Sequence, residues 1–162
     1  MERTGRQCSA RVKSHHGPPF TKTLDVTMTK ADALEYAKLS HYDRLVLTGA
    51  MGSLKRDVLR EATDDVWFLD HIRAFFERES GGSPTDVTPC TVRMTRELIG
   101  KDLVNLCTWG QDGAPLPLRK TEEELTVLVD SLMAHPFEFF LTTTPAGKDW
   151  VARYRHLVEE LR

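Results

Sequence analysis

The chain has 162 residues, of which 40% are hydrophobic and 28% are charged, a composition typical of one globular domain. No apolar run approaches the roughly 20 residues of a membrane-spanning helix, and the polar, basic start lacks the apolar segment of a signal peptide. The net charge of −2 divides into +3 for residues 1–27 and −5 for the remainder, which disfavours long-range attraction to nucleic acid.

The three cysteines, Cys8, Cys90 and Cys107, cannot all pair with one another, and no two of them have C-x-x-C spacing. Unpaired cysteines are typical of reducing compartments. Together with the missing signal peptide, this predicts a cytoplasmic protein with no membrane partner.

Residues 1–27 are expected to form a flexible N-terminal tail, because they are polar, contain a Gly-Pro-Pro sequence and lack apolar periodicity. Residues 28–162 are expected to form one domain, with residues 28–53 as a helical N-terminal extension. Apolar residues at helical spacing predict one helix over residues 43–62. Gly49 and Gly52 interrupt this pattern, so a break between two helices is the alternative.

The following elements are predicted from periodicity, caps and proline positions. We expect helices over residues 65–79, 88–100 and 121–135, the last with a Thr121–Glu124 capping box. Strands are expected over residues 103–109 and 137–142, with residues 114–118 extended. A final helix begins at Thr144-Pro145.

Three helices followed by two strands is the plan of a winged-helix domain. The stretches 64–69, 98–104 and 139–150 resemble the corresponding parts of small bacterial winged-helix-like proteins of unknown function. This resemblance implies an α+β, mostly helical, winged-helix-like domain with a small antiparallel two-stranded wing and a C-terminal helix. The helix over residues 88–100 would take the recognition position. The helix inserted between the two strands departs from the minimal plan.

No common catalytic or nucleotide-binding motif is found in the sequence. Cys90 is placed in the first turn of its helix, where the pKa of a thiol can be lowered, but a free cysteine is usually a small buried hydrophobe. The acidic run Glu122–Glu124 is typical of a first helical turn. We therefore expect no enzyme, no cofactor and no metal.

Recognition of a macromolecule is the function that remains, and the acidic body favours a basic protein partner, as for an inhibitor or immunity-type protein. Trp67 is predicted on the polar side of its helix, where an aromatic side chain is a candidate interface anchor. The N-terminal segment covering Trp67 is the alternative. The predicted partner-binding residues are Trp67, Asp70, His71 and Arg78, with Trp109 and Phe137 as weaker candidates at strand ends.

The alternative function is that of a DNA-binding transcriptional regulator that uses the helix over residues 88–100. Arginine can read guanine or hold phosphate, and the candidate residues are Thr91, Arg93, Arg96 and Lys101. Acidic residues nearby in the sequence bring the net charge of this patch close to zero, so we favour a protein partner over DNA.

Overall fold

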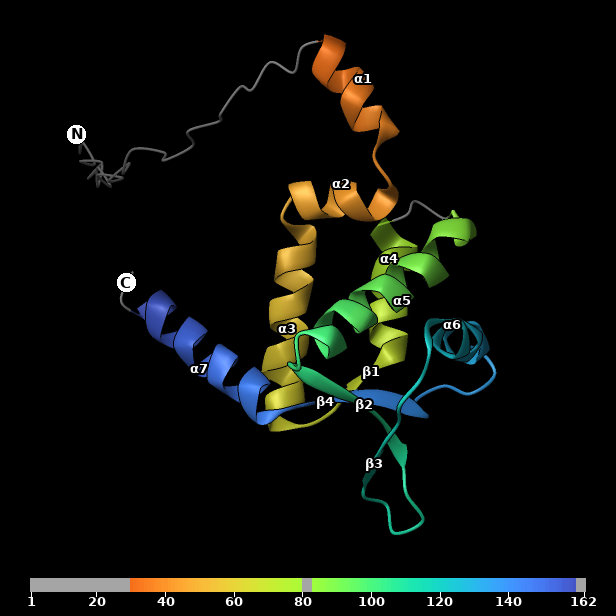
Figure 1. Cartoon of the computed structure of the whole chain (residues 1–162), viewed down its shortest axis with the longest axis vertical. Helices are drawn as coiled ribbons and strands as arrows, with labels where there is room; N and C mark the ends of the chain where they lie inside the picture. Colours follow the sequence, from red (N-terminus) through yellow and green to blue (C-terminus); the bar gives the residue numbers. More distant parts are fainter. Residues whose placement is uncertain (1–29, 80–82, 160–162) are drawn as a thin grey trace, which may run out of the picture.

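The computed structural model describes residues 30–79 and 83–159 (Figure 1), and the predicted tail of residues 1–27 lies outside them. Within the described part the fold is α+β, as predicted. In chain order the elements are α1 (Lys30–Lys38), α2 (His41–Leu47), α3 (Ala50–Asp64), β1 (Trp67–Phe68), α4 (Leu69–Glu79), α5 (Pro84–Gly100), β2 (Val104–Trp109), β3 (Pro115–Pro117), α6 (Glu122–Ser131), β4 (Phe139–Thr143) and α7 (Pro145–Glu159).

Four strands form one antiparallel sheet in the order β1-β4-β2-β3. β2 and β4 lie side by side with Leu106 opposite Leu141, so these two predicted strands do pair. The sheet is larger than the two strands expected, because β1 adds to β4 at one edge and β3 adds to β2 at the other. As predicted, a helix, α6, lies between the two paired strands in the sequence.

The two faces of the sheet carry different side chains. Because side chains alternate along a strand, the register places Leu106 and Leu141 on one face and Cys107 and Phe140 on the other. Leu106 and Leu141 belong to the main hydrophobic core, whereas Cys107 and Phe140 are buried apart from it. In Figure 1 the helices lie above the sheet and the β2–β3 hairpin extends below it. The face that bears Phe140 is therefore the outer face.

α5 is the central helix of the domain, since it contacts α2, α4, α6 and β2. Its inward residues repeat at helical spacing, and Met94 and Leu98 are almost fully buried. They belong to the same core as Ile72 and Phe76 of the neighbouring helix α4, which are also fully buried. This packing of an apolar stripe supplies most of the stability of such a helix.

Two helix boundaries differ from the sequence predictions, and in both cases glycine or proline explains the result. Residues 43–62 form two helices and not one, with the break at Gly49, whose φ of 80° lies in the left-handed region that favours glycine. This is the alternative that the two glycines indicated. α5 begins at Pro84 and not at Thr88, and proline is favoured at the first position of a helix. Pro89 therefore lies inside the helix, where it lacks the N–H that would bond to the preceding turn.

The predicted helix over residues 65–79 is wrong in its first turn, because Trp67 and Phe68 form β1 and α4 begins only at Leu69. Pairing with Leu141 and Phe140 of β4 holds these two residues extended. The predicted helix over residues 121–135 ends earlier, at Ser131, although its capping box is present.

β3 forms one edge of the sheet and contains two prolines, so few backbone N–H groups are exposed along its free side. Leu118 donates its backbone N–H inward to the carbonyl of Leu106, and N–H direction alternates along a strand. The nitrogens of Pro115 and Pro117 therefore face away from β2. Since proline has no N–H, this edge is protected against pairing with another chain.

Among the described residues, each helix is too short or too polar to span a lipid bilayer.

Candidate functional site

Four aromatic side chains gather on the outer face of the sheet, and we call them the aromatic face: Phe68, Trp109, Phe137 and Phe140. The ring of the fully buried Phe140 lies 4.3 Å from that of Trp109 and 6.0 Å from that of Phe68, between centroids. Phe137 lies edge-on to Phe68 at 5.2 Å. Trp109 and Phe137 remain 45% and 54% exposed, although the outer face of an antiparallel sheet is ordinarily polar.

Phe137 is held in an unfavourable backbone conformation. Its φ is 60°, in a region that costs a residue with a side chain about 1–2 kcal/mol. Two hydrogen bonds fix it there: its N–H donates to Asp70 Oδ2 at 3.1 Å, and its carbonyl accepts from Trp109 Nε1 at 3.3 Å. Two hydrogen bonds thus hold a strained residue whose side chain packs on Phe68 and is still 54% exposed.

Of the predicted partner-binding residues, Asp70 and His71 lie at the aromatic face. Asp70 holds the Phe137 backbone, and the exposed His71 ring lies 5.9 Å from that of Phe68 and 6.4 Å from that of Phe137. Arg78 is exposed in the last turn of α4, about 12 Å along the helix axis from Asp70. The structure therefore brings Asp70 and His71 together with Phe137 and leaves Arg78 at the far end of α4.

The predicted placement of Trp67 on the polar side of a helix is wrong. Trp67 lies in β1 opposite Leu141, so its side chain is on the inner face, where it is half-buried and packs against the main core. Its Nε1 is buried and has no hydrogen-bond partner among the described residues. The Trp67 ring also lies edge-on to the exposed His71 ring, at 5.3 Å between centroids, so the structure brings these two predicted residues into contact.

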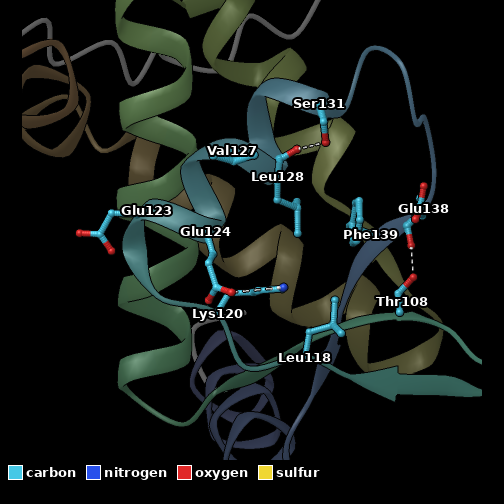
Figure 2. Close-up of a pocket in the computed structure, with 10 residues that line it drawn as sticks. All are labelled: Thr108, Leu118, Lys120, Glu123, Glu124, Val127, Leu128, Ser131, Glu138 and Phe139. Carbon is cyan, nitrogen blue, oxygen red and sulfur yellow. Dashed lines mark hydrogen bonds and ion pairs between the residues drawn. The ribbon is translucent and has the colours of Figure 1, made fainter.

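On the inner side of the sheet, a groove of about 520 Å³ opens between α6 and the ends of β2 and β4 (Figure 2). We call it the α6 groove, and its apolar lining consists of Leu118, Val127, Leu128 and Phe139. Charged and polar residues complete it: Thr108, Lys120, Glu123, Glu124, Ser131 and Glu138.

The arginines proposed for DNA contact are engaged within the protein. Arg93 bonds to Asp43 at 3.0 Å and to Glu97 at 3.3 Å, with its guanidinium 4.1 Å from the Tyr42 ring centroid. Arg96 forms an ion pair with Glu122. These pairs neutralise the exposed side of α5.

The remaining residues of the DNA-binding hypothesis do not restore a basic face. Thr91 is fully buried and donates to the carbonyl of Val87, so its side chain is not part of the exposed surface of α5. Lys101 is exposed at the end of α5. With α2, α4 and α6 packed around it, α5 is poorly placed to enter a major groove.

Glu97 is the centre of a partly buried network of hydrogen bonds and ion pairs that links α2, α3 and α5. Its carboxylate accepts from Tyr42 of α2 and Lys55 of α3 as well as from Arg93. Partial burial raises the pKa of Glu97, but these hydrogen bonds and charges lower it more, so the net shift is downward. The network is structural, because its charges are matched and its donors are satisfied.

The two described cysteines do not form a reactive site. Cys90 and Cys107 are free and buried, and burial, with the nearby Asp86 charge, raises the pKa of the Cys90 thiol to about 11. Cys90 lies in the second turn of α5 and not in its first, so the predicted lowering by the helix N-terminus does not apply. Within residues 30–79 and 83–159, no three His, Cys, Asp or Glu side chains group as metal ligands would.

Comparison of the chain with protein-family models, with curated proteins and with solved structures finds no match.

The sequence does not indicate Phe68 or Phe140 as parts of the site, because the helix predicted over residues 65–79 includes Phe68, which the structure places in β1. The signal for Phe140 was its alternation with Phe139 along a strand, which puts the two rings on opposite faces. The α6 groove was also missed. Its signal was Val127, an apolar residue that lies off the apolar stripe of α6 and is 70% exposed.

Proposed function

We propose that this chain is a non-catalytic recognition module that binds a protein partner through the aromatic face. The observation that carries the proposal is Phe137, whose ring is exposed while its backbone is fixed at a positive φ by Asp70 and Trp109. Strained residues that the surrounding structure over-determines cluster at binding sites. A rigid aromatic ring on such a support is preorganised for insertion into a partner.

The aromatic face has the composition of an interface core. Phe and Trp are enriched in the centres of protein interfaces, where their burial dominates the binding energy. Trp109 and Phe137 present their exposed area around the buried Phe140. An exposed apolar patch of this kind is otherwise a liability for solubility.

Charge supports a basic partner. The carboxylate of Asp70 lies at the aromatic face, and the body beyond residue 27 has a net charge of −5. Opposite charge on the partner would steer association and fix its orientation. This combination fits an inhibitor-type protein that covers a basic, partly apolar surface.

We further propose that the scaffold is winged-helix-like. In support, α3, α4 and α5 precede the paired strands β2 and β4 in the sequence, as in the three-helix-then-strands plan. β3 and α6 are then insertions between the two strands. On this scaffold the proposed binding surface is the outer face of the sheet, and not the helix in the recognition position.

The proposal is tested by capture of partners from the source cell on the tagged full chain, followed by mass spectrometry. Phe137→Ala removes the exposed ring, and its loss from an interface centre costs about 2 kcal/mol or more, a factor of about 30 in affinity. We expect a protein that the unmodified chain captures to be lost from Phe137→Ala and from Trp109→Ala.

Leu47→Ala is the matched control, since Leu47 is 67% exposed on α2, away from the sheet. It should capture the same partner as the unmodified chain. Circular dichroism would verify that each variant is folded. Equal capture by Phe137→Ala and by Leu47→Ala would refute the proposal.

A further inference from the structure

We propose that the α6 groove is a second, separate binding site, which takes a peptide segment of a partner protein with an apolar side chain next to a lysine or arginine. The groove lies on the inner side of the sheet, whereas the aromatic face lies on the outer side. The two sites are therefore independent, and either can bind without the other.

The lining of the groove selects the apolar part of the ligand. Its volume of about 520 Å³ falls within the range of about 300–1,000 Å³ that is usual for ligand sites. Leu128 and Phe139 form its floor and are largely buried, whereas Val127 on its wall is 70% exposed. An apolar side chain placed there would cover Val127 and gain the free energy of removing both surfaces from water.

Neighbouring apolar surface extends the groove along the sheet. Leu116 of β3 pairs with Thr108 and therefore lies on the same face as the groove. It is 52% exposed. A ligand longer than one side chain therefore has further apolar surface to contact, which fits a peptide better than a single small molecule.

The charges around the groove select a basic ligand. α6 carries four acidic residues and no basic residue, and the groove is lined by three carboxylates against one ammonium group. That ammonium, of Lys120, lies 3.7 Å from a carboxylate oxygen of Glu124 and pairs with it. The Glu123 side chain points out of the groove (Figure 2), so the carboxylate left to meet a cation of the ligand is that of Glu138.

Figure 2 shows where the cation of the ligand would lie. Glu124 and Lys120 stand at one end of the groove and Glu138 at the other, with Leu128 and Phe139 between them. The Glu123 side chain points away. Glu138 is exposed, and one of its carboxylate oxygens lies 3.3 Å from Nδ1 of the His135 ring. A lysine or arginine beside the apolar anchor can reach Glu138 in the same pose.

The test is selection of peptides from a random phage-displayed library on the immobilised full chain. Phages that also bind the Val127→Arg variant are removed first, because this substitution places a long cationic side chain in the groove. We expect the selected peptides to share an apolar residue next to lysine or arginine. Peptides that are acidic, or a selection that yields no enrichment, would overturn the proposal.

Synthetic peptides of the selected sequence are then titrated by fluorescence anisotropy against matched variants. Val127→Arg should weaken binding by about tenfold or more. Met133→Arg is the control, because Met133 is 76% exposed beyond the end of α6 and does not line the groove. It should change the affinity by less than about twofold. Equal loss with both variants would overturn the assignment to the groove.

The charge is tested by combining Glu138→Gln with a peptide in which norleucine replaces the basic residue. Glu138→Gln should lower the affinity for the basic peptide and leave the affinity for the norleucine peptide unchanged. The Phe137→Ala variant should bind both peptides normally, which separates this site from the aromatic face. If no peptide binds and the chain instead forms dimers that Val127→Arg abolishes, a second copy occupies the groove and the proposal is wrong.

Discussion

Replacing Gly147 by alanine should destabilise the domain, although the same change in most helices stabilises them. Gly147 lies in the first turn of α7, and a Cβ built on it would be 2.1 Å from the carbonyl oxygen of Leu103 and 3.1 Å from its carbonyl carbon. The neighbouring atoms are backbone atoms and cannot move away by rotating a side chain.

The magnitude follows from the distance that α7 must move. Favourable carbon–oxygen contacts begin at about 3.3 Å, so the helix must shift by about 1 Å. The shift strains the Thr144 cap, whose hydroxyl accepts from the Gly147 N–H at 3.0 Å and donates to the Asp102 carbonyl. Overpacking costs about 1–3 kcal/mol and a lost cap about 1 kcal/mol, against a gain of about 0.5–1 kcal/mol from removing glycine. We expect a net loss of about 2 kcal/mol.

Urea unfolding followed by circular dichroism measures this loss as a lower transition midpoint with an unchanged slope. Gly52→Ala in α3 is the matched control, because a Cβ there would meet no atom within 4 Å. This variant should be more stable than the unmodified chain by about 0.5–1 kcal/mol. If the two alanine variants had equal stability, the close approach of α7 to Leu103 would be wrong.

The free energy of unfolding of Phe137→Gly should exceed that of Phe137→Ala by about 1 kcal/mol, because only glycine adopts a φ of 60° without strain; equal urea midpoints of the two variants would show that the residue is not strained. Glu97 has a lowered pKa in the folded state, so its stabilising effect is present above its unfolded pKa of about 4.5 and is lost as the pH falls through the folded value. The unfolding free energy of Glu97→Gln should therefore fall less steeply below about pH 4.5 than that of the unmodified chain, and parallel curves would exclude the network as the cause. Replacing Pro115 and Pro117 together by threonine should increase self-association in static light scattering, because two N–H donors would face the free edge of β3; an unchanged mass would argue against this protection.

Local chemistry in the sequence was sufficient for several elements. The Thr121 side chain and Glu124 form the predicted capping box, and α5 ends at Gly100 as predicted. Both features depend on residues close together in the chain. Strand periodicity likewise predicted β2 and β4, because alternation of buried and exposed positions is visible in a short window.

Contacts between distant residues were not visible in the sequence. β1 has only two residues, and its strand conformation depends on β4, more than 70 positions later. The ion pair between Arg93 and Asp43 joins residues 50 positions apart. The sequence therefore indicated only that acidic residues accompany the arginines of α5, and not which acidic residue pairs with Arg93. The aromatic face could not be predicted for two reasons. Phe68 belongs to it because β1 pairs with the distant β4, and Phe137 belongs to it because of a positive φ that no sequence pattern indicated.

Site-specific photo-crosslinking tests most directly whether the aromatic face is the binding surface. p-Benzoylphenylalanine is placed at position 137 or, as control, at position 47, and the full chain is irradiated in its source cell. The account predicts a discrete covalent adduct with one protein from position 137 and no such adduct from position 47. The same adducts from both positions, or none from position 137 while the partner is captured, would contradict it.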